Sequence, residues 1–181
     1  IKGLNLVGIK VFDCGMASTP AMFMTTVTPG YEYDGAIMVT ASHLPFNRNG
    51  LKFFTKEGGL ESEDIYNILL RGQNKDFIAA QTQGSVTTID FTSVYAKGLV
   101  DKIRREVNNP NNYDHPLEGF KIIVDAGNGA GGFYVDKVLV PLGADTTGSQ
   151  YLDPDGSFPN HSPNPEDKEA MDAIVKAVKK N

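Results

Sequence analysis

Hydrophobic and polar positions form short blocks along the chain, and these blocks predict an alternation of strands and helices. Apolar runs rich in β-branched and aromatic residues predict strands at 6–12, 36–40 and 51–55. Apolar residues at helical spacing predict helices at 21–24, behind a Ser18-Thr19-Pro20 cap, from Ser62 onward, and at 91–107. The run at 36–40 is continuous, which is typical of a strand covered on both faces.

The same order of elements starts again in the second half of the chain. The predicted elements there are a strand at 120–125, a glycine-rich turn, a helical run that stops near Pro141, a strand within 144–151 and a helix over 166–180. The Asn/Pro-rich stretch at 108–112 precedes this restart and predicts a linker. We therefore expect an α/β protein with two lobes, 1–112 and 113–181.

Composition and charge narrow the classes of partner. The chain has 22 acidic and 17 basic residues, a net charge of −5 and scattered basic positions, all of which argue against a nucleic-acid partner. No apolar stretch approaches the roughly 20 residues needed to span a bilayer, so no membrane partner is expected. A single cysteine, Cys14, excludes an internal disulfide and favours a cytoplasmic location. Because the first residue is Ile1 rather than Met, we expect a segment of a longer chain.

The candidate chemistry is concentrated in the loop from Thr40 to Lys52. Ser42 lies where a predicted strand ends, in a loop that also carries His43, Arg48 and Lys52. His43 follows Ser42 directly and is poorly placed as the base of a triad, and no G-x-S-x-G elbow is present. A phosphoryl group on Ser42 would add close to two negative charges that the nearby cations could neutralise. From the residues alone, a plain turn with solvated cations stays open.

A resemblance favours a phosphorylated Ser42 over a plain turn. Thr40-Ala41-Ser42-His43-x-Pro45, followed by Asn49-Gly50-x-Lys52, resembles the phosphoserine motif of the α-D-phosphohexomutases, the phosphoglucomutase/phosphomannomutase type. Other stretches that resemble the family in the same order are 13–20, 34–38, 124–131 and 155–166. The resemblance covers effectively the whole chain. Leu44 departs from it, because the common motif has Asn there, which leaves the subfamily open.

The resemblance implies a reaction and a role for each loop residue. Phosphorylated Ser42 would donate to a hexose phosphate, and the hexose 1,6-bisphosphate intermediate would return its other phosphate. The net reaction would move phosphate between C1 and C6. His43 would contact the phosphoserine region, and Lys52 would act as a general acid/base or as a charge partner. Arg48 is a weaker candidate.

The resemblance also implies mixed sheets, a metal and missing parts. The lobe at 1–112 would be the C-terminal part of a first domain, and 113–181 an incomplete second domain. Mg²⁺ would bind a phosphate oxygen on Ser42 together with an Asp-x-Asp-x-Asp loop that this chain lacks. Partners would be a hexose phosphate and the absent domains, with hexose 1,6-bisphosphate as activator. We expect the fragment alone to be an inactive structural piece; its sugar and oligomeric state stay open.

Two further features have competing interpretations. The spacing Gly127-x-Gly129-x-x-Gly132 follows a predicted strand, as a Rossmann-like dinucleotide-binding oxidoreductase requires, and Asp153 supplies an acidic residue further on. The glycines could equally serve a tight turn without any ligand. Asp153-Pro154-Asp155 is expected to be a structural turn rather than a metal site. His115 and His161, each near proline, are predicted to be surface turn residues.

Overall fold

The computed structural model describes residues 1–181, which divide into two compact units. The first unit contains residues 1–38 and 52–92, and the second contains residues 39–51 and 93–181. Parallel and antiparallel strand pairs both occur, which confirms a mixed α/β fold.

None of the helices combines the length and the apolar character that crossing a bilayer requires.

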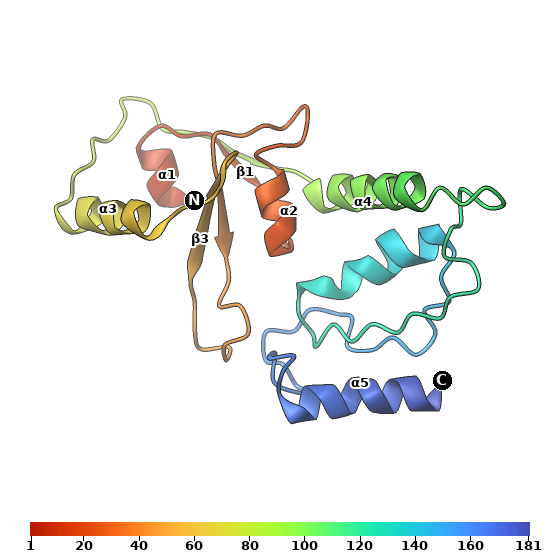
Figure 1. Cartoon of the computed structure of the whole chain (residues 1–181). Coiled ribbons are helices and arrows are strands. Elements are labelled where there is room, and N and C mark those ends of the chain that lie inside the picture. Colours follow the sequence, from red (N-terminus) through yellow and green to blue (C-terminus); the bar gives the residue numbers. More distant parts are fainter. The chain divides into compact units, whose positions relative to one another are not determined.

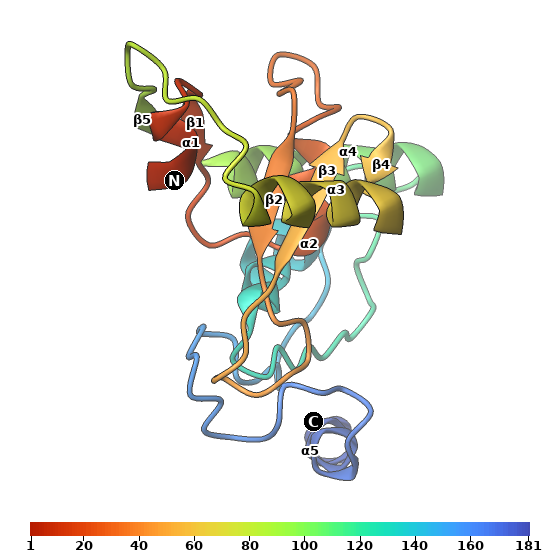
Figure 2. The same ribbon diagram turned by 90° about the vertical axis from the view of Figure 1, so that its left-hand side faces the viewer.

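The first unit contains two small sheets and their flanking helices (Figures 1 and 2). Its elements are α1 (Lys2–Leu6), β1 (Val11–Asp13), α2 (Thr19–Met24), β2 (Ala36–Val39), β3 (Leu51–Thr55), β4 (Gly58–Gly59), α3 (Ser62–Gln73) and β5 (Val86–Thr88). β1 pairs in parallel with β5, and the second sheet has the order β2-β3-β4 with β3 antiparallel to β4. Figure 2 shows β2 and β3 side by side, and the loop that joins them carries Ser42.

The predicted elements of this unit are partly confirmed. The cap before α2 is present, since the Ser18 Oγ accepts a hydrogen bond from the Ala21 N–H at 3.3 Å, and β3 has the predicted bounds. The expected strand at 6–12 is wrong in its first half, where α1 ends instead. Gly8, at φ 84°, turns the chain so that the Ile9 N–H donates to the Leu4 carbonyl at 3.0 Å. The strand therefore starts only at Val11.

The core of the first unit holds the beginning of β2 and the end of β3. Ala36 is buried, and the Thr26 hydroxyl, itself buried, lies 3.3 Å from the Thr55 carbonyl. The predicted burial of the whole strand at 36–40 is wrong, because the Val39 side chain is 62% exposed. Phe91, 1% exposed, packs edge-on against Tyr31 with a ring separation of 4.8 Å. The sheet is thus anchored at its base and becomes exposed toward the loop.

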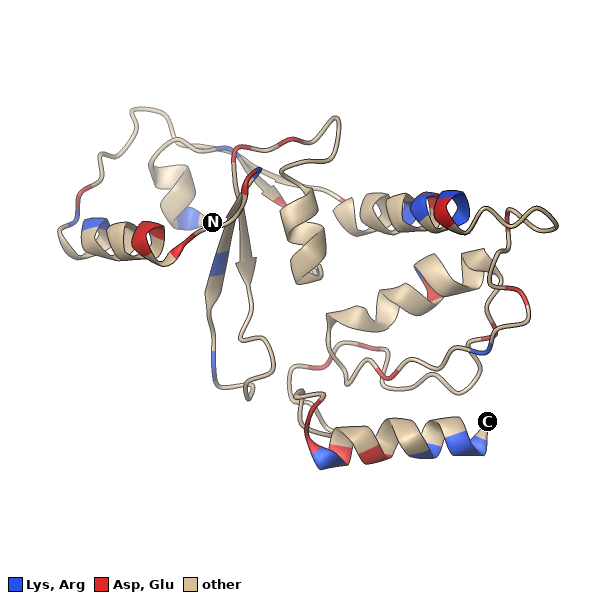
Figure 3. Ribbon diagram, viewed as in Figure 1, with Lys and Arg blue, Asp and Glu red and all other residues tan.

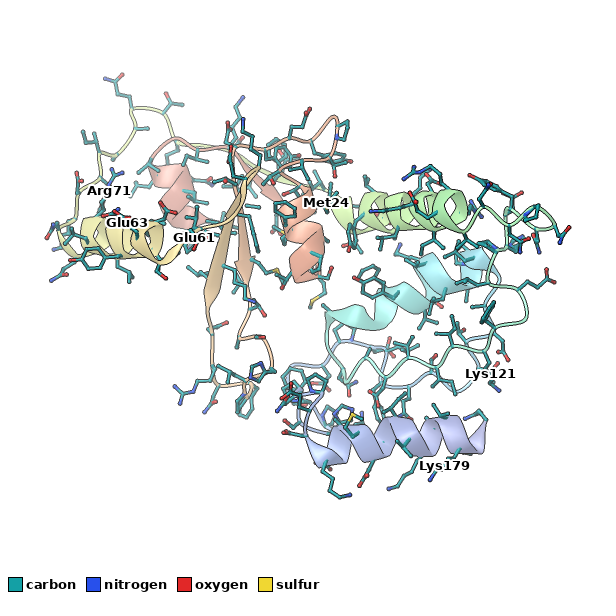
Figure 4. The ribbon with its side chains drawn as sticks, viewed as in Figure 1. Met24, Glu61, Glu63, Arg71, Lys121 and Lys179 are labelled. Carbon is teal, nitrogen blue, oxygen red and sulfur yellow. The ribbon has the colours of Figure 1, made fainter.

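α3 is an amphipathic helix with charges matched to its ends. Glu63 and Asp64 lie in its first turn and Arg71 lies in its last, so these charges interact favourably with the helix dipole. The Asp64 carboxylate also accepts from the Glu61 N–H at 3.1 Å. Figure 3 shows the opposite charges at the two ends, and Figure 4 labels Glu61, Glu63 and Arg71 there, with Met24 on α2. Because α3 buries none of its residues, the capping and charges at its ends stabilise it more than packing does.

The second unit is built around α4 (Phe91–Val107), whose bounds match the prediction. Three short helical segments follow later in the chain: η1 (Ala130–Gly132), η2 (Val135–Leu139) and η3 (Val140–Leu142). The core contains Ala96, Val100, Val138 and Leu142, with Leu99, Ile103, Leu117, Phe133 and Tyr134 packed against it. The helix that the sequence places before the linker at 108–112 therefore packs with the residues that follow this linker.

The expected strands at 120–125 and 144–151 form only isolated parallel bridges, Lys121 with Asp145 and Asp125 with Gln150. Between these bridges the Val124 N–H donates to the Ser149 hydroxyl at 3.0 Å, so a side chain interrupts the backbone ladder. The predicted helical run that stops near Pro141 is present, but it consists of π and 3₁₀ segments rather than a regular α-helix, and Pro141 lies inside η3. Gly143, at φ 89°, ends it.

The chain closes with α5 (Lys168–Lys180), which confirms the helix expected over 166–180. It docks through buried Ala170 and Ala177. The Lys121 ammonium donates to the Asn181 carbonyl at 2.6 Å, which ties the end of α5 to the start of the extended segment. Figure 4 labels Lys121 on that segment and Lys179 on α5.

Candidate functional site

The serine loop, residues 40–50, joins β2 to β3 and is closed at its base by one backbone contact. The Thr40 N–H donates to the Gly50 carbonyl at 3.0 Å. Two tight turns follow within the loop, in which Leu44 N–H donates to the Ala41 carbonyl at 3.1 Å and Arg48 N–H to the Pro45 carbonyl at 2.9 Å. Every residue from 42 to 49 is exposed. The loop has an ordered base and an accessible tip.

Ser42 has an unusual backbone conformation. Its φ is 60°, in the left-handed region that serine rarely adopts, and its N–H donates to the Thr40 Oγ1 at 2.9 Å. The Ser42 Oγ lies 3.3 Å from the His43 Nδ1, so the two side chains are brought together despite being sequence neighbours. His43 thus reaches this hydroxyl, but no third residue hydrogen-bonds its other ring nitrogen as the orienting member of a triad would.

The other two candidate residues are cations without internal partners. Lys52 is the second residue of β3, and Arg48 follows the second turn of the loop. Both are exposed, and neither side chain forms a hydrogen bond or an ion pair with the rest of the chain. Neither makes a direct hydrogen bond to Ser42. Their charges are available to an anionic group, since no carboxylate of the chain neutralises them.

A second polar cluster lies at the glycine-rich turn of the second unit, and sequence reasoning missed it. His161 is 8% exposed, and its Nε2 lies 3.0 Å from Oδ1 of Asp125. The other Asp125 oxygen accepts from the Gln150 side-chain amide at 2.8 Å. The prediction of a surface turn is wrong for His161, whereas His115 is exposed as predicted. The ring is buried where it meets Asp125, which lies 36 residues earlier at the end of the extended segment 120–125.

Both ring nitrogens of His161 face acceptors. Nδ1 lies 2.7 Å from the Ser162 carbonyl, which can only accept, so Nδ1 carries a proton, and the Asp125 carboxylate favours a second proton on Nε2. Burial lowers the pKa of His161. The hydrogen bonds to Ser162 and Asp125 and the charges of Asp125 and Glu169 outweigh burial and raise its pKa overall. This geometry favours a buried imidazolium–carboxylate pair.

The glycines of the turn are required by packing. A Cβ on Gly132 would lie 1.9 Å from the Leu152 carbonyl oxygen, and a Cβ on Gly127 would lie 3.0 Å from the His161 ring. Asn128 uses its own polar groups internally, donating to the Tyr151 and Asp153 carbonyls. A short 3₁₀ segment rather than a regular α-helix follows the turn. Neither this geometry nor any comparison supports the dinucleotide-binding alternative.

The acidic turn at 153–155 is held by hydrogen bonds. Oδ1 of Asp155 accepts from the Ser157 N–H at 2.9 Å and from its hydroxyl at 2.7 Å, and these bonds lower the pKa of Asp155. Residues 1–181 contain no group of three or more His, Cys, Asp or Glu side chains arranged around a common metal position. The acidic turn is therefore a local capping structure in which Asp155 already has its partners.

Fold and loop together define an α/β protein of two units in which an exposed loop carries a serine at positive φ. Known proteins match this chain along almost its whole length. The profile of phosphoglucomutase/phosphomannomutase α/β/α domain I matches residues 1–77, and that of α/β/α domain II matches residues 95–181. The chain belongs to the phosphoglucomutase/phosphomannomutase family.

Individual relatives agree with this assignment. A phosphoglucomutase of Neisseria gonorrhoeae is 34% identical over 98% of this chain and 36% of its own length. A phosphomannomutase of Salmonella typhimurium is 33% identical over 98% and 38%. A crystal structure of a phosphoglucomutase/phosphomannomutase family protein from Burkholderia thailandensis superposes with a TM-score of 0.79 at 26% identity, covering 99% of this chain and 37% of that one. The chain thus spans little more than a third of these relatives.

Proposed function

We propose that this chain is part of an enzyme that interconverts hexose 1-phosphate and hexose 6-phosphate, with Ser42 carrying the phosphoryl group. Membership of the family supports the reaction class. The observation that carries the assignment to Ser42 is its Oγ, exposed on a loop with φ 60° and 3.3 Å from His43. A reactive hydroxyl has to be both held and reachable, and this loop satisfies both conditions.

The proposed reaction consists of two phosphoryl transfers. In the first, a sugar hydroxyl attacks the phosphorus of phosphoserine 42 in line, the bond from phosphorus to Oγ breaks, and the proton of the sugar hydroxyl ends on the released Ser42 Oγ. In the second, the Ser42 hydroxyl attacks the phosphorus of the other phosphate of the bound hexose 1,6-bisphosphate, the bond from that phosphorus to the sugar oxygen breaks, and the serine proton ends on the released sugar hydroxyl. Positioning and neutralisation of charge on the phosphoryl oxygens are the main requirements of such transfers.

The loop cations are suited to that neutralisation. A lysine acting as a base has to lose its proton near neutral pH, which needs burial or a neighbouring cation. Lys52 is exposed rather than buried, which favours the role of a charge partner. His43 is close enough to donate to the oxygen of a phosphoserine, and Arg48 is an additional source of positive charge.

A divalent cation is part of this proposal only through Ser42. A phosphate oxygen on this residue is a hard ligand of the kind that Mg²⁺ prefers. The carboxylates of residues 1–181 do not complete a site, so Ser42 is the one ligand that we propose from this chain. A hexose phosphate is the proposed substrate, and hexose 1,6-bisphosphate is the proposed activator because it can phosphorylate an unloaded Ser42.

The proposal is tested by trapping the phosphate on the full-length parent protein. After incubation with glucose 1,6-bisphosphate and proteolysis, mass spectrometry should find one phosphate on the peptide that contains Ser42. Ser42→Ala should abolish this mark, whereas Ser62→Ala, which changes an exposed serine of α3, should retain it. An unmarked wild-type peptide in a protein that nevertheless interconverts hexose phosphates would contradict the proposal.

Residues 1–181 alone should show no turnover with glucose 1-phosphate or mannose 1-phosphate. The reason is that the chain spans about a third of its relatives and lacks a complete metal site. A coupled assay with the full-length protein as positive control measures this. Turnover by the isolated segment at a rate near that of the parent would contradict the expectation.

A further inference from the structure

The backbone of Ser42 is in a conformation that its own side chain does not favour. Glycine, asparagine and aspartate adopt positive φ most readily, whereas Ser42 has φ 60°. The residue is exposed, so no packing around its side chain imposes the conformation. Contacts elsewhere in the serine loop must hold it, because strained backbone persists only where the surroundings determine it.

Those contacts converge on Thr40. Its Oγ1 accepts the Ser42 N–H at 2.9 Å, and its own N–H donates to the Gly50 carbonyl at 3.0 Å. Gly50 in turn approaches so closely that a Cβ there would lie 2.9 Å from the Thr40 carbonyl oxygen. Thr40 is thus fixed to the opposite arm of the loop, and its hydroxyl passes that fixed position on to Ser42. Thr40 is itself only partly exposed, unlike the residues from 42 to 49.

We propose that Thr40 is a positioning residue for phosphoryl transfer at Ser42, through the hydrogen bond from its hydroxyl to the Ser42 N–H. This inference rests on the proposed function of Ser42. With φ held at 60°, the Oγ and the adjacent His43 ring keep a fixed place relative to Thr40 and the end of β2, and a change to negative φ would move both groups together away from that place. In-line transfer tolerates little misplacement, since an error of about 1 Å can cost about 10²-fold in rate.

The hydrogen bond from Ser42 to the Thr40 hydroxyl should matter for the position of Ser42 and little for folding stability. The Ser42 N–H lies in an exposed part of the chain, so water can replace Thr40 as its acceptor and little folding free energy is lost. Water cannot restrict φ in the same way. Removal of the Thr40 hydroxyl should therefore lower the rate of transfer while leaving the fold and the affinity for substrate nearly unchanged.

The test compares Thr40→Val with Thr40→Ser in the full-length protein. Valine keeps the shape and removes the acceptor, and serine keeps the acceptor. We expect Thr40→Val to lower kcat about 10- to 100-fold with KM within about twofold, and Thr40→Ser to restore kcat to within about threefold of wild type. Thr82→Val, at an exposed threonine outside the loop, should leave kcat, KM and the melting temperature unchanged.

Gly50→Ala provides a second, independent variant. Its added Cβ would push the Thr40 carbonyl away, so it should lower kcat in the same way without removing any hydroxyl. If Thr40→Val and Gly50→Ala both keep wild-type kcat while wild-type Ser42 is phosphorylated, the role of Thr40 is refuted and the function of Ser42 stands. If wild-type Ser42 takes no phosphate and Ser42→Ala keeps full activity, the proposed function itself fails. A loss of kcat in Thr40→Val that serine does not rescue also refutes the role of Thr40.

Discussion

The serine loop and the glycine-rich turn next to the His161 cluster both contain a non-glycine residue at positive φ, but they use it differently. Ser42, at φ 60°, leaves its hydroxyl exposed with one polar neighbour in reach, and the nearby cations have no partner. Asn128, at φ 58°, donates to two carbonyls and accepts from the Asn160 amide at 2.7 Å. The same backbone conformation leaves the Ser42 hydroxyl exposed in the serine loop, whereas it lets Asn128 complete a hydrogen-bond network at the glycine-rich turn.

The difference indicates which cluster is available for chemistry. A buried polar group is costly unless it is paired, so the members of the His161 cluster are all satisfied and hold two segments together. The serine loop has lone pairs and positive charges that only a ligand or water can satisfy. Loss of activity and loss of stability should therefore separate between the two regions.

The largest effect expected is on activity alone. Ser42→Ala in the full-length protein should lower kcat by about 10³-fold or more, because the phosphoryl carrier is gone. The free energy of unfolding should change by less than about 0.5 kcal/mol, since the side chain is exposed. Steady-state kinetics and urea unfolding measure the two quantities. A variant that unfolds much more easily than wild type would break the comparison.

The next effect is on stability alone, at the glycine-rich turn. Gly132→Ala should destabilise by about 3 kcal/mol, because its Cβ would lie 1.9 Å from the Leu152 carbonyl oxygen and backbone must move. Gly131→Ala is the matched control, since a Cβ there meets nothing within 4 Å. Urea unfolding measures both. Equal stability of the two variants would contradict the view that packing requires Gly132, and would reopen the question of a ligand at the turn.

The buried ion pair gives a third contrast. Asp125→Asn should cost about 3 kcal/mol, since it leaves the His161 imidazolium buried beside a neutral partner. Asp172→Asn breaks the exposed Lys168–Asp172 pair, 2.5 Å apart on α5, and should have no measurable effect. The comparison by urea unfolding sharpens the distinction between buried and exposed charge. An Asp125→Asn variant as stable as wild type would show that the cluster does not hold its segments together.

Local signals in the sequence were sufficient for some elements. α2 and α4 were predicted because a hydroxyl cap and four-residue apolar spacing act within a few turns of chain. The residues of the serine loop were found through resemblance, since the residues alone left a plain turn open. The left-handed φ of Ser42 was not predictable, because it depends on Thr40 and on Gly50, which lies across the loop.

Other features depend on contacts that periodicity does not report. The apolar face of α4 was visible, but not that it packs against Val138 and Leu142. The apolar run at 120–125 and the stretch at 144–151 suggested strands, yet the Ser149 hydroxyl interrupts their pairing. His161 next to prolines suggested an exposed turn, and only its meeting with Asp125 explains its burial. In each case a tertiary contact outweighs the local pattern.

The smallest effect expected is the pH dependence that His161 gives to stability. Its pKa is raised above the ordinary value of 6.5 in the folded chain, despite burial, chiefly by Ser162 and by Asp125. The folded state therefore binds the proton more tightly than the unfolded state. This contribution to stability is fully present below pH 6.5 and is lost as the pH rises through the folded pKa.

His161→Asn should remove this slope, so that its stability changes less than that of wild type as the pH rises above 6.5. His115→Asn, at an exposed histidine, is the control and should keep the wild-type slope. NMR titration of the His161 ring gives the folded pKa directly, and urea unfolding at several pH values gives the slope. A ring that titrates below 6.5 would mean that burial outweighs its two hydrogen bonds, and the cluster would then hold a neutral histidine.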